Sequence, residues 1–357
     1  MKLLRTAILL STITLITASL VMAQARRPQP QATPPATPQE VSQDDVVRVD
    51  TELVTLTATV TDQRGRYIAN LKQSDFTVYE DGVKQELGYF NTGDRVPVSL
   101  GIIFDTSGSM VDKIEGVRDA VEHFVKSVST GDEIFLIRFS EDAELVQDFT
   151  DDRRRILRAV ERLEPQGSTA LYDAIFLGLQ RVTGGKHRKR ALLLITDGND
   201  TSSSVKRDTA LTLARKSEVT IYALGIGHGE RGSFGHDQHG SQIKDTVDMR
   251  VLRAFAEPTG GAAYLLENAH QGGRDLVDEA AAQVAAELKQ QYTLGYYPSN
   301  KRKDDSFRQI KIELPDKSLR VRTKRGYARI AAVTRLTIYS SLTLMSEHHQ
   351  GAHPKKP

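Results

Sequence analysis

Oxygen-bearing side chains gather in three short segments of this sequence, where their spacing could support metal binding. The segments are Asp105-Thr-Ser107-Gly-Ser109, Gly167-Ser-Thr169-Ala-Leu-Tyr-Asp173 and Thr196-Asp197-Gly198. They offer carboxylates and hydroxyls and almost no imidazole. Hard cations such as Mg²⁺ prefer oxygen ligands in an octahedral arrangement that leaves several positions to water. The residue types therefore predict a divalent-cation site if the fold brings the three segments together.

The elements that must position these segments show the pattern of an α/β domain. Apolar runs of strand length alternate with stretches of helical periodicity, which indicates a parallel sheet covered on both faces. The predicted strands are Val98–Phe104, Glu133–Phe139, Ala191–Ile195, Val219–Ile226 and Ala262–Leu266, and two of the predicted helices have apolar stripes within 114–128 and 171–182. Ligands bind beyond the carboxyl ends of such strands, so the three segments should meet at one edge. We predict a doubly wound, mostly parallel sheet over residues 97–270.

The motif Asp-x-Ser-x-Ser, followed by a lone Thr and then by an apolar-Thr-Asp-Gly strand end, resembles the metal-ion-dependent adhesion site (MIDAS) of von Willebrand factor type A (VWA) domains. All five positions of that motif are filled, by Asp105, Ser107, Ser109, Thr169 and Asp197. The resemblance covers about residues 97–270 and implies a Rossmann-like VWA fold. It also implies Mg²⁺, or Mn²⁺ or Ca²⁺, held directly by Ser107, Ser109 and often Thr169, with Asp105 and Asp197 bound directly or through water.

Neutral hydroxyl ligands leave such an ion electron-poor, so its remaining position favours an outside anion. The resemblance implies that this anion is an Asp or Glu carboxylate of a partner protein. The flanking segments 75–82, 292–298 and 325–327 resemble more narrowly the VWFA-related family described from acidobacteria, a match that implies little about a biochemical role.

Each segment also has a structural interpretation. Asp105 and the two serines could cap a helix that follows Met110, and Ser168 or Thr169 could cap the next helix. Asp173 is expected to face neighbouring backbone or solvent and is not assigned to the metal. The loop 227–240 holds three of the nine histidines, which makes a transition-metal site conceivable, but we interpret it as a solvated insertion near the predicted ion.

Composition and missing motifs exclude several function classes. The absence of cysteine excludes thiolate metal sites and cysteine nucleophiles, and 48 Lys and Arg against 46 Asp and Glu give no basic field for nucleic acid. A phosphotransferase of the HAD type would need a second Asp where Ser107 stands. The sequence contains neither a phosphate-binding loop of the Gly-x-x-x-x-Gly-Lys type nor a Gly-x-Ser-x-Gly nucleophile elbow. We therefore predict that the protein is not an enzyme.

The N-terminal residues have the pattern of an export signal. Lys2 and Arg5 precede an apolar run from Ala7 to Ala23, and the small-residue pattern Ala23-Gln-Ala25 follows, which predicts a signal peptide over 1–25. An uncleaved membrane anchor is the alternative, because the run approaches the length that spans a bilayer. The Pro- and Gln-rich residues 26–45 are predicted to be an extended linker.

Two further segments flank the α/β domain and read as strands. In 46–96, Val and Leu alternate with Thr from Val54 to Thr61, and Asp81-Gly82 predicts a tight hairpin. In 291–330 the alternation is again of the antiparallel type, and residues 271–290 form a connecting helix. We predict that 46–96 and 291–330 pair in one small β module into which the α/β domain is inserted. The tail 331–357 has no assigned role.

Together these features predict an exported, periplasmic or extracellular, metal-dependent protein-binding module of adhesion type. Its partner would be a protein that presents an Asp or Glu carboxylate. We expect it to bind no nucleic acid, and to be associated with a membrane only if the N-terminal segment stays uncleaved. One alternative is an envelope scaffold whose site is vestigial, and a less favoured one is a Mg²⁺-dependent hydrolase.

Overall fold

The computed structural model describes residues 53–92, 96–227, 246–267, 274–302, 304 and 306–328. The predicted signal peptide, linker and tail lie outside the described residues, as does the loop 228–240 with its three histidines. Among the helices that are described, none is both long and apolar enough to cross a bilayer.

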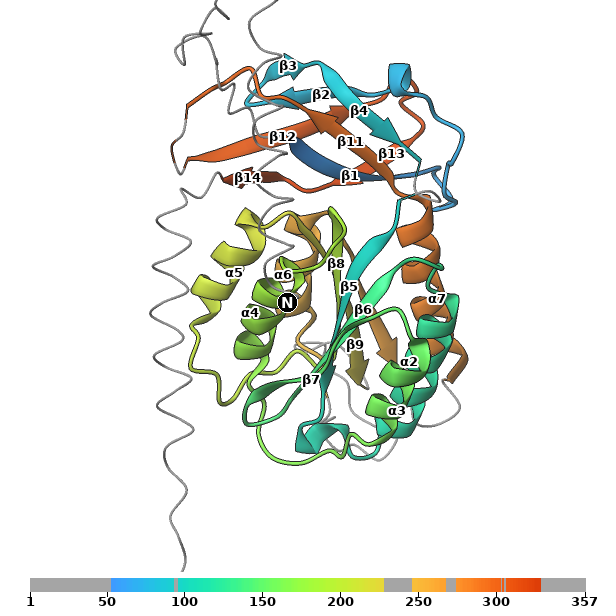
Figure 1. The fold of residues 1–357 in the computed structure, drawn as a ribbon, viewed down its shortest axis with the longest axis vertical. Helices are drawn as coiled ribbons and strands as arrows, with labels where there is room; N and C mark the ends of the chain where they lie inside the picture. The colour runs from blue at the N-terminus through green and yellow to red at the C-terminus, as the bar shows by residue number, and fades with distance from the viewer. Residues whose placement is uncertain are drawn as a thin grey trace, which may run out of the picture. The chain divides into compact units, whose positions relative to one another are not determined.

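A six-stranded sheet forms the centre of the α/β domain (Figure 1). Its strands are β5 (Val98–Asp105), β6 (Glu133–Phe139), β7 (Ala143–Thr150), β8 (Lys189–Thr196), β9 (Val219–Gly227) and β10 (Ala263–Glu267). Their order is β10-β9-β8-β5-β6-β7, and every neighbouring pair is parallel except β6 and β7. The predicted fold class, a doubly wound and mostly parallel sheet, is confirmed.

Helices cover both faces of this sheet, as the continuous apolar strands require. One face packs against α2 (Ile114–Ser127), α3 (Arg153–Glu161) and α7 (Arg274–Gln290), and the other against α4 (Leu171–Val182), α5 (Arg207–Lys216) and α6 (Met249–Ala256). Short 3₁₀ turns occur at η4 (Gly108–Met110) and η5 (Glu257–Thr259). Central strand β5 is buried along its whole length, which makes its end a rigid platform.

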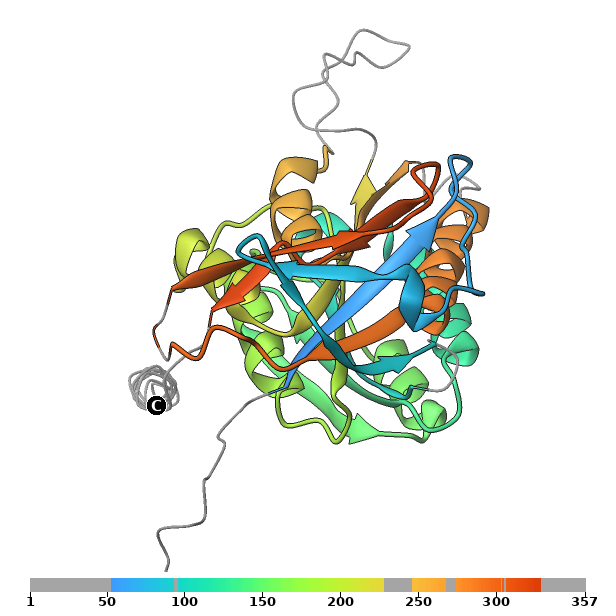
Figure 2. The same ribbon diagram turned by 90° about the horizontal axis from the view of Figure 1, so that it is seen from above.

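Strands from both ends of the described chain form two antiparallel sheets (Figure 2). They are β1 (Val54–Thr61), β2 (Thr77–Glu80), β3 (Val83–Gln85), β4 (Leu87–Asn91), β11 (Tyr292–Tyr296), β12 (Phe307–Glu313), β13 (Arg320–Thr323) and β14 (Gly326–Ala328), with a 3₁₀ turn η2 (Gln73–Asp75). The sheet orders are β13-β1-β11-β4 and β14-β12-β2-β3. Early and late strands alternate in the first sheet, and in the second they meet where β12 pairs with β2. The Asp81-Gly82 hairpin is confirmed, with φ of 48° and 80° at its two central residues.

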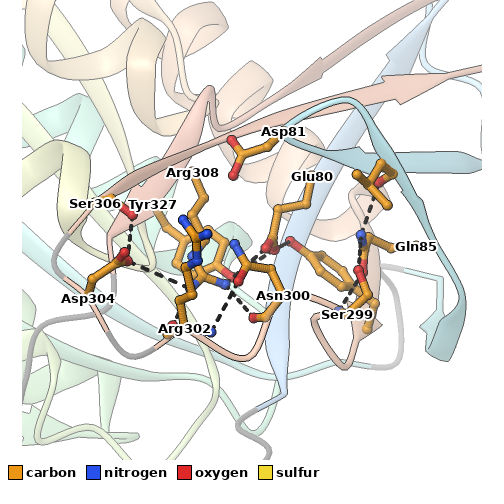
Figure 3. A network of polar contacts seen from close by, with 12 residues as sticks. Glu80, Asp81, Gln85, Ser299, Asn300, Arg302, Asp304, Ser306, Arg308 and Tyr327 are labelled. Carbon is orange, nitrogen blue, oxygen red and sulfur yellow. Dashed lines mark hydrogen bonds and ion pairs between the residues drawn. The ribbon is translucent and has the colours of Figure 1, made fainter.

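A buried ion pair lies inside this β module (Figure 3). Arg308 donates to Glu80 at 3.0 Å, and both side chains are only 1% exposed. The hydroxyls of Tyr296 and Tyr327 donate to the other oxygen of Glu80 at 2.7 and 2.8 Å. Arg308 also donates to the backbone carbonyl of Asn300 at 2.9 Å, which holds the loop before β12. Because its charge and hydrogen bonds are shared among several strands, this network favours one pairing of the two chain segments.

Helix α7 carries a second buried carboxylate, Glu287, which connects the α/β domain to the β module. It accepts hydrogen bonds from Thr59 of β1 and Tyr222 of β9, both at 2.8 Å, and forms an ion pair with Arg322 of β13. Burial and the negative Glu287 raise the pKa of the Tyr222 hydroxyl, which therefore stays protonated as a donor. The Glu287 side chain thus links helix α7 to β9 of the α/β domain and to β1 and β13 of the β module.

Candidate functional site

The ends of β5 and β8 bring the first and third predicted segments together. The two strands are parallel neighbours with Phe104 opposite Ile195, so Asp105 and Thr196 emerge side by side. Asp105 is fully buried, and the Thr196 hydroxyl donates to its Oδ2 at 2.6 Å. The carboxylate of Asp105 is therefore fixed by the neighbouring strand.

The chain after β5 turns back on Asp105 and presents two serine hydroxyls. The backbone N–H of Ser107 donates to Asp105 Oδ1 at 2.8 Å, and the hydroxyl oxygens of Ser107 and Ser109 lie 3.0 Å apart. Ser107 is buried and Ser109 is exposed. Neither hydroxyl caps a helix: Ser107 precedes η4 without a capping bond, and the N-cap residue of α2 is Lys113. The helix-capping interpretation of these residues is wrong, which leaves their oxygens for another role.

The loop that carries Thr169 is fastened to the loop after β5. Gly108 donates its N–H to the Gly167 carbonyl at 3.0 Å, and Gln166 donates to the Thr106 carbonyl at 2.7 Å. Gly167 has a φ of 78°, a left-handed conformation that glycine adopts without strain, and an added Cβ would meet the side chain of Glu141. These contacts bring the second predicted segment to the same sheet edge as the first.

Thr169 itself is held by its backbone. Its N–H donates to the Thr201 hydroxyl at 2.9 Å, and its carbonyl accepts from Thr201 at 2.8 Å and from Ser202 at 3.1 Å. Its own hydroxyl makes no hydrogen bond with any residue that the structure describes. The N-cap residue of α4 is Ala170, so the prediction that Ser168 or Thr169 caps this helix is wrong.

Asp197 follows β8 in a tight turn. Its Oδ1 accepts from the N–H of Asn199 at 2.9 Å, and its carbonyl accepts from the N–H of Asp248 at 2.9 Å. Gly198 has a φ of 79°, and an added Cβ would lie 2.9 Å from the Asp248 carbonyl oxygen. The turn thus needs glycine both for its conformation and for the close approach of the chain before α6.

The site is electrostatically unbalanced. Burial, and secondarily the neighbouring Asp197 carboxylate, raise the pKa of Asp105 to about 6. Among the described residues, no Lys, Arg or His forms an ion pair with Asp105 or Asp197. Two carboxyl groups, buried to 0% and 3% exposure, therefore lie at the sheet edge that carries the serine and threonine hydroxyls, and neither has an ion-pair partner among the described residues. This donor set fits a bound divalent cation, which would supply the missing charge.

All five predicted residues gather at the carboxyl edge of the sheet. Within the described ranges no group of three or more His, Asp or Glu side chains is placed so that it could hold a metal ion, and three of these five positions are hydroxyls. Asp173, which we did not assign to the metal, accepts from the backbone N–H groups of Ser204 at 3.0 Å and Val205 at 2.7 Å.

Sequence reasoning missed two supporting hydroxyls. Thr196 was recognised only as part of a strand end, although it donates to Asp105, and Thr201 was not noticed at all. For Thr196 a signal existed, since a hydroxyl at the end of a buried strand needs a polar partner. For Thr201 the sequence held no such signal, because its partner Thr169 is 32 residues away.

Comparison with known proteins agrees with this fold. Residues 100–199 match the family model of the von Willebrand factor type A domain. An uncharacterized protein of Synechocystis is 28% identical over 210 residues, which is 54% of this chain and 50% of that protein. The chain spans about half the length of the curated relatives it matches.

Two solved structures are similar to this chain at low identity. A von Willebrand factor type A protein from Catenulispora acidiphila has 13% identity and a TM-score of 0.44, covering 79% of this chain and 75% of that one. Proximal thread matrix protein 1 from the mussel byssus, solved with a zinc-occupied MIDAS motif, has 14% identity and a TM-score of 0.45, covering 60% of this chain and 50% of that one. On its own sheet topology and the matched domain, the α/β part of this chain has the VWA fold.

Proposed function

We propose that this chain is an exported, adhesion-type binding module that captures a carboxylate of a partner protein through a divalent cation at the MIDAS. The observation that carries the proposal is the pair of buried carboxyl groups, Asp105 and Asp197, which form no ion pair among the described residues. They lie at the same sheet edge as the residues that carry the hydroxyls, Ser107, Ser109 and Thr169. A structural cluster of this kind would leave two buried charges uncompensated.

The donor set suggests a division of roles. The hydroxyls of Ser107, Ser109 and Thr169 are free of capping bonds and would hold Mg²⁺, Mn²⁺ or Ca²⁺ directly. Asp105, both of whose oxygens already accept a hydrogen bond, would hold it through water, and Asp197 directly or through water. The cation would supply an electrophilic position that an outside carboxylate can fill. Ser109 is exposed, so a carboxylate from outside can reach this edge of the sheet.

We further propose that binding occurs without chemical turnover. The Ser107 hydroxyl lies 3.0 Å from the Ser109 hydroxyl, and within the described ranges no histidine forms a hydrogen bond with it that would activate it as a nucleophile. We propose that the protein is exported, because its N-terminal residues have the pattern of a signal peptide. We also propose that it is related to the VWFA-related proteins described from acidobacteria, because its flanking segments resemble theirs. Recognition through one local cation should respond strongly to chelator.

Titration calorimetry of the full chain with MgCl₂ or MnCl₂ tests the proposal directly. Asp105→Ala and Ser109→Ala should each weaken ion binding at least tenfold, because each removes a donor from the set. Asp173→Asn is the matched control, since Asp173 lies in the first turn of α4, four residues after Thr169, and accepts from the backbone N–H groups of Ser204 and Val205. Absence of ion binding by the wild-type protein, or equal affinity in Asp105→Ala, would refute the metal site.

A pull-down from envelope extract, with and without EDTA, separates this proposal from the scaffold alternative. Release of the captured partner by EDTA, and failure of Asp105→Ala to capture it, support metal-dependent binding. Capture that survives both changes would instead assign recognition to another surface and make the MIDAS vestigial.

A further inference from the structure

A groove of about 510 Å³ lies between helix α3 and strand β7, beside the candidate metal site. Strand β7 is the edge of the six-stranded sheet and pairs, among the described strands, only with β6. Four arginines line the groove, Arg138, Arg155, Arg158 and Arg162. The groove is therefore positively charged, whereas the acidic and basic residues of the whole chain nearly balance.

Three of these arginines have no acidic partner among the residues that the structure describes. Arg138 is held by Glu144 at 2.6 Å, but Arg155, Arg158 and Arg162 are exposed and form no ion pair. Arg155 and Arg158 lie in α3 and Arg162 is its C-cap residue. Their intervals of three and four residues place them on one side of the helix. Besides Glu144, Glu164 is the only acidic residue lining the groove, which leaves a net positive surface.

This arrangement is unfavourable for the helix alone. Arginines occupy the first turn of α3 at 153–155, where the helix dipole favours acidic residues, and the first turn contains none. Like charges three and four residues apart also repel by a few tenths of a kcal/mol for each pair. Asp152 at the N-cap pairs with Arg154, and Arg153 donates to the backbone carbonyls of Lys126 and Val128. The groove-lining Arg155, Arg158 and Arg162 have no such contact among the described residues, and unpaired cations on one surface attract anionic ligands.

The end of the groove at Gln166 adjoins the loop after β5 that carries part of the candidate metal site. Gln166 lines its rim, and the Gln166 backbone N–H donates to the carbonyl of Thr106, the residue after Asp105, at 2.7 Å. Thr169 follows three residues later in the same loop. A chain segment that presents a carboxylate to the metal site can therefore extend into the groove along α3.

We propose that the groove between α3 and β7 binds an acidic peptide segment of the partner whose carboxylate occupies the metal site, an inference that rests on the proposed function. Guanidinium groups match carboxylates with two parallel hydrogen bonds, which suits Arg155, Arg158 and Arg162 to Asp and Glu side chains. From Arg155 to Arg162 the helix rises about 10 Å, a length that about three residues of extended peptide span. The ligand is thus a short acidic segment. Its binding affinity has one contribution from the groove, which salt weakens, and one from the metal site, which a chelator removes.

Fluorescence anisotropy with a labelled hexaglutamate peptide, in buffer containing MgCl₂, tests this inference on the full chain. Hexaglutamine of the same length is the uncharged probe. The double variant Arg158→Gln/Arg162→Gln should weaken hexaglutamate binding about tenfold, because two charge-assisted contacts are lost. Arg154→Gln is the control, since Arg154 is on the same helix but faces Asp152 at 3.5 Å and does not line the groove. It should bind like the wild type.

The outcomes separate the two proposals. If the double variant binds hexaglutamate as tightly as Arg154→Gln does, while its melting temperature shows that it is folded, the groove inference is wrong. If the double variant weakens binding while Asp105→Ala and EDTA leave it unchanged, the groove stands and the metal-bridged function fails. Binding of heparin without binding of hexaglutamate would overturn the peptide assignment in favour of a sulfated polysaccharide.

Discussion

Replacing Asp105 by Asn should make the metal-free protein more stable while it abolishes metal binding. In the folded protein without metal, the pKa of this fully buried carboxyl is about 6, against an ordinary value of 3.8. At neutral pH the chain therefore folds with a charge that its surroundings disfavour. Asn has nearly the same shape as Asp and carries no charge, so it removes this cost.

The magnitude follows from the two pKa values. The two values differ by about two pKa units, and each unit corresponds to 1.36 kcal/mol. The ionised Asp105 therefore lowers the free energy of unfolding by about 3 kcal/mol at pH 7.5. Because the folded state keeps the proton up to about pH 6 and the unfolded chain loses it near pH 4, the free energy of unfolding falls as pH rises through this window. The amide of Asn would face the Thr196 hydroxyl, which must turn to accept, and we subtract about 1 kcal/mol for that bond. The expected net gain is about 2 kcal/mol.

Urea unfolding followed by circular dichroism measures this difference. In EDTA at pH 7.5, Asp105→Asn should unfold at a higher urea concentration than the wild type, and at pH 4.5 the difference should shrink by about 2 kcal/mol. Added MgCl₂ should stabilise the wild type alone, since a ligand stabilises only the state that binds it. A variant that is less stable than the wild type in EDTA at pH 7.5, or a difference independent of pH, would refute the reasoning.

Three further substitutions test the framework that holds the site. Glu80→Ala should lower the free energy of unfolding by about 3 to 5 kcal/mol, because it leaves Arg308 buried without its partner, and urea unfolding measures the loss. Glu287→Ala should cost a similar amount and should increase proteolysis between the α/β domain and the β module, whereas equal protease resistance would contradict its linking role. Gly198→Ala should weaken Mg²⁺ binding in calorimetry, because an added Cβ would lie 2.9 Å from the Asp248 carbonyl; unchanged affinity would show that the turn is not needed.

The strands that carry the site could be predicted from the sequence because they are buried on both faces. Strand β5 has an uninterrupted buried run, so hydrophobicity alone predicts a strand over Val98–Phe104, one residue short of its end at Asp105. Strand β7 (Ala143–Thr150) was not predicted. It is an edge strand whose residues are all partly or fully exposed, and its pairing with β6 has two register irregularities. It therefore shows neither the apolar run nor the strict alternation of a regular strand.

Predicting which residues supply the site oxygens was easier than predicting what supports them. The hydroxyls of Ser107 and Thr169 belong to local motifs, and such motifs can be seen in sequence. The contacts that orient them, such as Thr201 with Thr169 and Gln166 with Thr106, join residues tens of positions apart. Whether a serine caps a helix or stays available for a ligand is decided by where the helix begins, and α2 begins at Ile114, five residues after Ser109.

The β module contacts the α/β domain near the amino ends of its strands, whereas the candidate site lies at their carboxyl ends. Thr57 of β1 hydrogen-bonds at 3.1 Å with Thr220, the second residue of β9, and Arg322 of β13 donates at 3.2 Å to the carbonyl of Gly260, which precedes β10. Asp105, by contrast, is the last residue of β5. The contacts of the β module therefore leave the metal-site edge and the adjoining groove open to a partner. A partner bound there need not displace the β module, which is why the Glu287 substitution should reduce stability more than ligand affinity.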